Sequence, residues 1–147
     1  MKKRSSVWQQ GIRIGLVGGI VEILLALVGM VEAFSRRYMI SDVISMGQTL
    51  LLVVAMFTGY LAAKRAARSE PLRVLVSSLV SGLMVGGLMS LLVMVGSAVR
   101  LRAVFINASP GLYSLLTFHQ GAGTGMILLL IFGALSSLLS DLLYLSP

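Results

Sequence analysis

The sequence predicts an all-α integral membrane protein, a four-helix bundle made of two helical hairpins, with a short interfacial helix between spans three and four. Of its 147 residues, 57% are hydrophobic and only 12% are charged, whereas a soluble domain typically carries about 25% charged residues. Four long apolar runs are separated by clusters of basic residues, which is typical of a polytopic membrane protein. The runs are continuous and do not alternate, which favours helices over the strands of a membrane barrel.

The four predicted spans follow from the length that a helix needs to cross a bilayer, about 20 apolar residues for a core about 30 Å thick. They cover about residues 12–33, 43–63, 73–99 and 121–144 of a single membrane domain, residues 1–147. In lipid the backbone must satisfy its own hydrogen bonds, and a helix does so within one segment. We expect Ser41 to cap the second span, with Asp42 in its first turn.

Residues 109–119 connect the third and fourth spans. Ser109 can cap a helix, and Pro110 suits its first position. The spacing i, i+3, i+4, i+7 then recurs in Leu112, Leu115, Leu116 and His119. This pattern predicts a short amphipathic helix at the outer interface, with an ordinary ordered loop as the alternative.

The basic residues predict the orientation of the chain. One group precedes span one or lies between spans two and three: Lys2, Lys3, Arg4, Arg13, Lys64, Arg65, Arg68 and Arg73. The smaller group lies on the other side: Arg36, Arg37, Arg100 and Arg102. Since Lys and Arg accumulate in cytoplasmic loops, we expect both termini in the cytoplasm. The first apolar run is long and lacks a small-x-small cleavage site, so it is predicted to be a span and not a signal peptide.

Small residues recur four apart on three of the predicted helices. In "FHQGAGTGMILLLIFG" the alternate glycines suggest a nucleotide loop, but Met126 stands where a dinucleotide motif needs glycine, and no Lys-Ser/Thr pair follows. Gly121 and Gly125 instead form a small-xxx-small pair. The other ladders are Gly11, Gly15 and Gly19 in span one, and Ser78, Gly82, Gly86 and Ser90 in span three. Such ladders let helix backbones approach closely in lipid, so they are predicted packing faces, either within the chain or with other subunits.

Glu22 is the most informative side chain because it falls near the bilayer centre. A charge there costs at least about 2.5 kcal/mol, so Glu22 should face protein. Two interpretations stay open: it contacts an ion or substrate, or it is a protonated carboxyl bonded to Gln48 or Ser90. Asp141 is expected to reach the interface at the end of span four.

Other chemistry is sparse. The chain has no cysteine and a single histidine, which excludes disulfides and thiolate metal sites. His119 is a candidate ligand for a haem or chlorophyll metal, or else an interfacial histidine without a ligand. No catalytic triad, carboxylate pair or metal cluster is visible, so we predict a protein that is not an enzyme and has no cofactor. The expected partners are the lipid bilayer and other membrane subunits, in an oligomer or hetero-complex, and not nucleic acid.

Two stretches carry a resemblance: "GIVEILLALVGMVEAFSRRYMISDVISMGQTLLL" and "RAVFINASPGLYSLLTFHQGAGTGMILLL". They resemble the N-terminal membrane region that precedes the permease core in some bacterial branched-chain amino-acid ABC importers. The markers are "GMVEAF", "SMGQTLLL", "NASP" and "LTFHQG", and the resemblance extends from about Gly11 to Leu143. It implies an accessory or scaffolding domain for hydrophobic amino-acid uptake, located in a bacterial inner membrane.

In those importers a long multi-span permease follows, whereas this sequence stops at Pro147. We therefore expect that this chain alone neither transports nor binds ATP. Two other functions stay open. One is a structural subunit of an energy-transducing or photosynthetic complex, in which His119 touches pigment. The other is a small oligomeric transporter with Glu22 in the pore.

Overall fold

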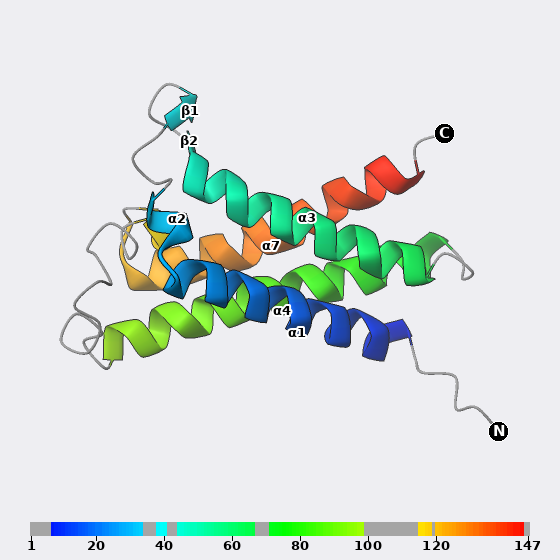
Figure 1. Cartoon of the computed structure of the whole chain (residues 1–147). Coiled ribbons are helices and arrows are strands. Elements are labelled where there is room, and N and C mark those ends of the chain that lie inside the picture. The colour runs from blue at the N-terminus through cyan, green and yellow to red at the C-terminus, as the bar shows by residue number, and fades with distance from the viewer. Residues whose placement is uncertain are drawn as a thin grey trace.

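A computed structural model describes residues 7–33, 38–40, 44–66, 71–98, 115–118 and 120–145. Along the chain the elements are α1 (Val7–Leu27), α2 (Met30–Ala33), β1 (Tyr38–Ile40), β2 (Ile44–Ser45), α3 (Met46–Ala66), α4 (Pro71–Ala98) and α7 (Ala122–Leu145). The four long helices alternate in direction, so the start of α1 and the end of α7 lie at the same end of the bundle (Figure 1). The predicted four-helix architecture is confirmed.

Each long helix is apolar enough and long enough to cross a membrane. The segments that meet this requirement are Trp8–Leu27, Met46–Ala66, Leu72–Ala98 and Ala122–Leu142. At about 1.5 Å per residue, α4 is longer than the thickness of a hydrocarbon core of about 30 Å. It must therefore tilt or project from the membrane.

The first span ends earlier than the sequence predicted. Helix α1 stops at Leu27, and Gly29 takes a φ of +82°. The backbone N–H of Gly29 donates to the carbonyl oxygen of Ala26 at 3.2 Å, and a left-handed glycine just past the last turn is a common helix terminator. The short helix α2 then brings Val31 into the core, where a Cβ on Gly47 would meet its carbonyl oxygen.

Helix α3 begins with a capping box centred on Ser45. The N–H of Gln48 donates to Ser45 Oγ at 3.2 Å, and the N–H of Ser45 donates to Gln48 Oε1 at 3.1 Å. These reciprocal bonds satisfy backbone donors that the first turn of a helix cannot satisfy itself. The prediction placed the cap at Ser41, which lies outside the described residues together with Asp42. The serine immediately before Met46 performs that role instead.

A short β-hairpin, absent from the prediction, precedes α3. Strands β1 and β2 are antiparallel, with Tyr38 paired to Ser45 and Ile40 paired to Ile44. The second strand continues directly into α3 (Figure 1). The hairpin therefore leads into the capped end of that helix.

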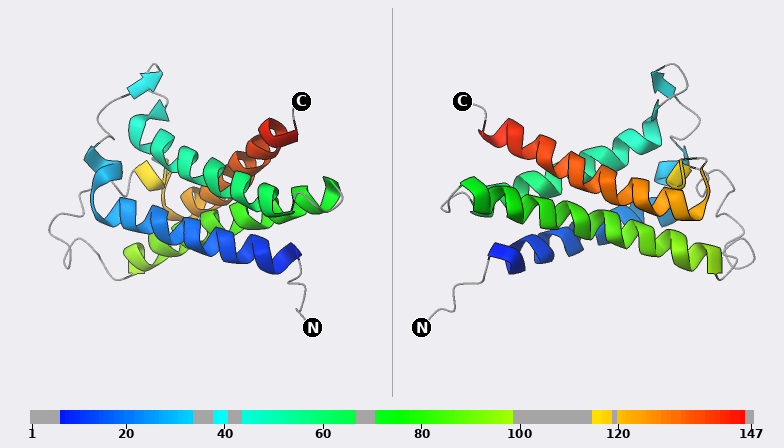
Figure 2. Two further views of the ribbon diagram at one scale, coloured as in Figure 1. Left: turned by 45° about the vertical axis from the view of Figure 1, so that its right-hand side comes forward. Right: turned by 180° about the vertical axis from the view of Figure 1, so that it is seen from behind.

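Helix α4 is the centre of the bundle. It contacts α1, α3 and α7, and its most extensive contact is with α7. Figure 2 shows α4 between α1 and α7 when the bundle is seen from behind. The contact between α1 and α3 is smaller than that between α1 and α4, so the main packing partner of α1 is not the long helix that follows it in the sequence.

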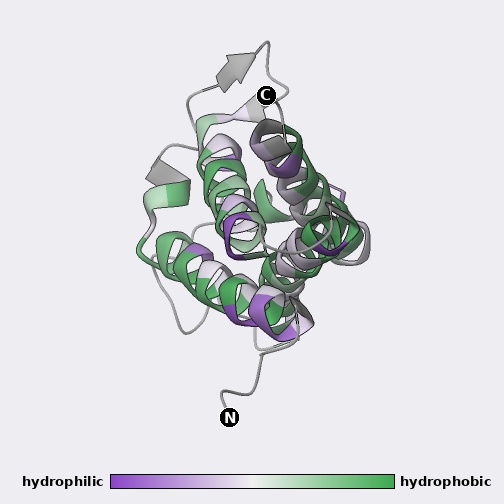
Figure 3. Ribbon diagram, turned by 90° about the vertical axis from the view of Figure 1, so that its right-hand side faces the viewer, coloured by the Kyte–Doolittle hydropathy of each residue, from purple (hydrophilic) through white to green (hydrophobic). Residues whose placement is uncertain are grey.

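The bundle buries many small residues and exposes many large apolar ones, whereas large apolar residues dominate the core of a soluble bundle. The small buried residues include Ala55, Ala62, Ala63, Ser77, Ser78, Ser81, Ser136 and Ser137. Large apolar side chains point outward, including Val17, Val28, Phe57, Leu72, Ile127 and Leu142. Hydrophobic residues make up most of the long helices when the bundle is viewed along its length (Figure 3). This outer surface suits lipid, and the small interior residues permit close helix contact.

The glycine ladder of α1 lies against α4. Its members and the residues they face are Gly11 with Ser77, Gly15 with Ser81 and Gly19 with Leu88. A Cβ on Gly11 would lie 2.5 Å from the carbonyl oxygen of Ser77, and one on Gly15 would lie 2.6 Å from that of Ser81. Real Cβ atoms essentially never approach so closely. The two backbones are therefore in direct contact.

The ladder of α4 lies against α7. A Cβ on Gly86 would lie 2.6 Å from the carbonyl oxygen of Leu129. A Cβ on Gly82 would meet the carbonyl oxygen of Gly133, and a Cβ on Gly133 would meet that of Gly82. Because the obstacles are backbone atoms on both sides, these glycines interlock the two helices.

Gly121 and Gly125 differ from the other small-residue pairs. A Cβ on Gly125 would lie 2.6 Å from Cα of Thr117, so this glycine packs on the segment before α7. Gly121 has no described atom within 4 Å of its notional Cβ, and its φ is +93°. Among the described residues Gly121 therefore makes no close packing contact, and its position requires a left-handed backbone, which glycine adopts without strain.

Of the predicted interfacial segment, the structure describes residues 115–118 only. Leu115 and Leu116 are buried in the main apolar cluster with Val31 and Met89. This part of the segment therefore packs against the bundle and does not lie on its outer surface. The remainder of the predicted helix, His119 included, lies outside the described residues.

Candidate functional site

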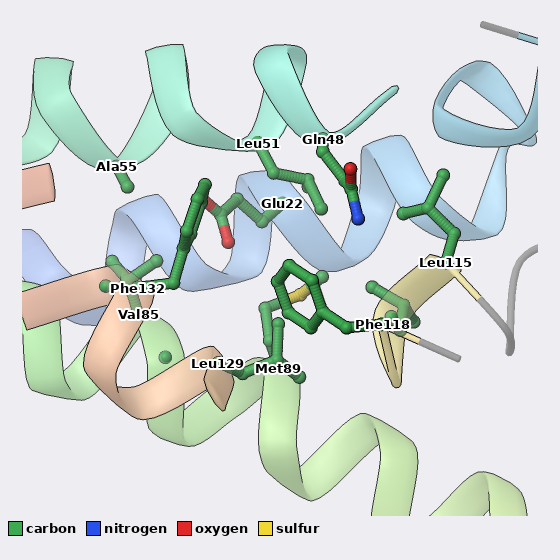
Figure 4. A pocket seen from close by; sticks show the side chains of 13 residues that line it. Glu22, Gln48, Leu51, Ala55, Val85, Met89, Leu115, Phe118, Leu129 and Phe132 are labelled. Atoms are coloured by element: carbon green, nitrogen blue, oxygen red, sulfur yellow. The ribbon is translucent and has the colours of Figure 1, made fainter. Parts of the chain in front are cut away.

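Glu22 lies inside the bundle and not at its lipid-facing surface. Its side chain is only 3% exposed, although α1 is otherwise apolar on both sides of it. It lines a narrow cavity of about 10 Å³ to which α3, α4, α7 and the segment before α7 also contribute. Figure 4 shows its carboxyl group beside the ring of Phe132, with Gln48 directed into the same space.

The structure brings Glu22 and Gln48 into one cavity. The expected hydrogen bonds from Gln48 or Ser90 to Glu22 are not among the bonds of the described residues. Among the described residues Glu22 Oε1 has no partner. Gln48 Oε1 accepts from the backbone of Ser45, as part of the α3 cap. Ser90 Oγ bonds the carbonyl oxygens of Gly86 at 2.8 Å and Met126 at 3.0 Å, so it joins α4 to α7 instead of reaching Glu22.

The size of this cavity limits its chemistry. A cavity needs roughly 10–15 Å³ to hold one water molecule, so this one has room for about one. Its other walls are apolar, among them Leu51, Val85 and Met89. A carboxyl group and an amide facing one water-sized space can bind a proton or a water molecule, but a substrate the size of an amino acid does not fit without a rearrangement of the helices.

Asp141 forms a second intramembrane polar site, which the sequence analysis did not identify. We expected this carboxylate to reach the interface, and that expectation is wrong. Asp141 is fully buried, because α7 packs along α4 over this stretch. Ser78 Oγ donates a hydrogen bond to Asp141 Oδ2 across the α4–α7 contact.

Serines recur with the same spacing on α4 and α7, the two helices that the Ser78–Asp141 bond joins. On α4 the pattern is Ser77, Ser78, Ser81 and Gly82, and on α7 it is Ser136, Ser137, Ser140 and Asp141. In each helix the four residues occupy positions i, i+1, i+4 and i+5, which form a continuous polar strip on one face. All seven polar members are buried. This repeated spacing is the sequence signal that would have identified the site.

The serine hydroxyls divide into two groups. Ser136 donates to the carbonyl of Phe132 at 2.6 Å, and Ser137 to that of Ala134 at 2.9 Å. Such bonds to the preceding turn satisfy a hydroxyl inside an apolar medium. The other group has no partner among the described residues: the hydroxyls of Ser77, Ser81 and Ser140, together with Asp141 Oδ1. Buried polar atoms of this kind usually bind a water molecule or a ligand.

Neither polar site has the composition of a metal centre or a catalytic triad. In residues 7–33, 38–40, 44–66, 71–98, 115–118 and 120–145, no three His, Cys, Asp or Glu side chains come together as metal ligands. The two carboxylates belong to separate helices, Glu22 in the cavity beside α3 and Asp141 in the serine cluster of α4 and α7. The described sites are therefore isolated acidic groups within a packed bundle.

No protein-family model, curated protein or solved structure matches this chain.

Proposed function

We propose that this multi-pass protein is a non-enzymatic accessory or scaffolding domain of an ABC-type permease for branched-chain amino acids. Its four helices provide a rigid surface in the membrane on which a transporting partner assembles. The role in amino-acid uptake rests on the resemblance of "GMVEAF", "SMGQTLLL" and "LTFHQG" to the membrane region that precedes such permeases.

The observation that supports a scaffold is the backbone contact of α4 with both neighbours. Gly11 and Gly15 bring α1 onto α4, and Gly82 and Gly86 bring α7 onto it. Helices that touch through their backbones cannot separate without losing these contacts. The cavity at the centre has room for about one water molecule. A packed bundle of this kind suits support and assembly better than conduction.

We infer that both termini face the cytoplasm of a bacterial inner membrane. Four exposed cations lie in the second turn of α1, the last turn of α3 or the first turn of α4: Arg13, Lys64, Arg65 and Arg73. These parts of the three helices lie toward the end of the bundle where α7 ends (Figure 1). Basic residues are retained on the cytoplasmic side during insertion. The chain has no cysteine, so single cysteines can report the orientation. In intact cells, a membrane-impermeant maleimide should label Gln120→Cys and spare Lys64→Cys, and the opposite pattern would refute this orientation.

Amino-acid uptake tests the proposed function. Deletion of the gene from its host should lower the uptake of labelled leucine, isoleucine and valine, and leave lysine uptake unchanged. Purification in mild detergent should recover a permease and its ATPases with the chain. Unchanged uptake of all three branched-chain substrates would exclude the role.

A proton- or ion-coupled transporter is the second candidate, because Glu22 is buried and its Oε1 has no partner among the described residues. An intramembrane carboxyl with these properties is a typical element of ion pathways. The purified chain reconstituted alone should then carry flux that Glu22→Gln abolishes. As a scaffold it should carry no flux by itself, and Glu22→Gln should leave uptake in cells unchanged.

A further inference from the structure

A hollow lies between α1 and α3 on the lipid-facing side of the bundle. These helices meet where a Cβ on Gly18 would collide with the side chain of Thr58. On either side of this contact the side chains leave a space of about 480 Å³. That volume is within the range of about 300–1,000 Å³ that is usual for ligand sites.

The walls of the hollow are apolar over a length that corresponds to one leaflet. At about 1.5 Å per residue, they run about 12 Å along α1 from Arg13 to Val21 and about 18 Å along α3 from Val53 to Arg65. Half of a hydrocarbon core is about 15 Å. Within these walls Val17 is 65% exposed, Val53 55% and Phe57 60%. The dimensions suit an acyl chain that lies parallel to the helices.

One end of the hollow is cationic. Arg13 comes from the second turn of α1 and Arg65 from the last turn of α3, and both side chains are exposed. Because α1 and α3 are antiparallel, these two arginines meet at the same end of the hollow (Figure 1). No acidic side chain is among the described residues that line it. Two guanidinium groups without a lining carboxylate favour a phosphate, which arginine binds through paired N–H donors.

We propose that this hollow binds an anionic phospholipid from the leaflet on the side of the termini. The headgroup phosphate lies between Arg13 and Arg65, and an acyl chain extends along Val17 and Phe57 toward the Gly18–Thr58 contact. Basic pockets between membrane helices recognise anionic headgroups in this manner. The bound lipid fills the space left by the loose α1–α3 contact and joins the two helices. This proposal does not depend on a role in amino-acid uptake.

Native mass spectrometry of the delipidated chain in detergent tests the site. Phosphatidylglycerol and phosphatidylcholine of identical acyl chains are titrated separately, and the dissociation constant of the first lipid adduct is measured. The wild-type chain should prefer phosphatidylglycerol. Arg13→Gln/Arg65→Gln should weaken phosphatidylglycerol binding by about tenfold or more, as expected for the removal of two cationic contacts to an anionic headgroup. Lys64→Gln is the matched control, because Lys64 is exposed in the same turn as Arg65 but does not line the hollow.

A second variant tests the acyl-chain part of the site independently of charge. Val17→Trp places a large ring in the hollow with both arginines intact, so it should weaken binding of either lipid. Glycerol phosphate, which has the headgroup charge but no acyl chain, should not displace the bound lipid. Circular dichroism confirms that each variant remains helical. Equal affinity for both lipids would overturn the proposal, and so would undiminished phosphatidylglycerol binding by the double arginine variant. A wild-type dimer that Val17→Trp alone dissociates would also overturn it, because a second copy of the chain would then occupy the hollow.

Discussion

Replacing Gly82 with alanine should weaken the contact between α4 and α7. The new Cβ would meet the carbonyl oxygen of Gly133 and would lie 2.8 Å from Cβ of Ser137. A backbone carbonyl inside a helix cannot rotate away, so the helices must shift apart. Gly87 is one turn further along α4, and there the nearest atom is a methyl carbon of Leu130 at 4.0 Å. Gly87→Ala is therefore the matched control.

The comparison of these two variants isolates the packing cost. Alanine is favoured over glycine in a helix interior by about 1 kcal/mol, and this gain applies to both positions. Overpacking of a well-filled interior typically costs about 1–3 kcal/mol, and only Gly82→Ala incurs it. Gly82→Ala should therefore be less stable than Gly87→Ala by about 1–3 kcal/mol.

Unfolding in mixed micelles measures this difference. The purified variants are titrated with sodium dodecyl sulfate, and helix content is followed by circular dichroism in both directions to establish reversibility. Similar transition slopes allow the midpoints to be compared as free energies. If Gly82→Ala is as stable as Gly87→Ala, then the α4 and α7 backbones are not in contact at this position, and the central argument for a packed scaffold is refuted.

Three further substitutions test the polar groups by the same unfolding measurement. Ser78→Ala should cost about 1–3 kcal/mol, because it leaves Asp141 without its donor. The cost should fall by at least about 0.5 kcal/mol in an Asp141→Ala background, which has no side-chain oxygen to accept the bond. Equal costs in both backgrounds would exclude the bond. Glu22→Met should be at least as stable as the wild type, because an apolar side chain of similar size has no polar atom to satisfy. Glu22→Ala should be about 2 kcal/mol or more less stable than the wild type, because the smaller side chain leaves a cavity. A destabilised Glu22→Met would reveal a polar partner of Glu22. Ser45→Ala should lower the stability by about 1 kcal/mol through loss of the α3 cap. Ser97→Ala, at an exposed position, should change the stability by no more than about 0.5 kcal/mol. Similar values for the two variants would refute the capping role.

The number and approximate position of the membrane helices could be predicted because they depend on local composition. A run of about 20 apolar residues is sufficient to specify a span, whatever the rest of the chain does. The small-residue ladders were also visible, since spacing alone places Gly11 and Gly15 on one face of a helix. What spacing could not identify was the partner of each face. Gly11 packs against Ser77, which is far away in the sequence.

The exact ends of the helices depended on details that hydropathy does not contain. The apolar run continues past Leu27 and is interrupted only by Glu32 before Ala33, yet α1 ends because Gly29 adopts a positive φ. Ser45 and Gln48 cap α3 through side-chain bonds, although Ser41 had equally suitable chemistry. Hydropathy identifies neither the helix terminator nor the capping residue, and it does not predict the contact that α2 makes with α3.

The sequence by itself determined that this is a multi-pass membrane protein with four spans separated by basic clusters. These features follow from the transfer of individual residues between water and lipid. The environment of the two carboxylates was decided only by the tertiary structure. Asp141 was expected at the interface, but Ser78, distant in sequence, meets it inside the bundle. Glu22 shares a cavity with Gln48 because α1, α3, α4 and α7 all line the same space. Burial of a side chain is a property of how helices meet, and that arrangement depends on backbone contacts that form between distant segments.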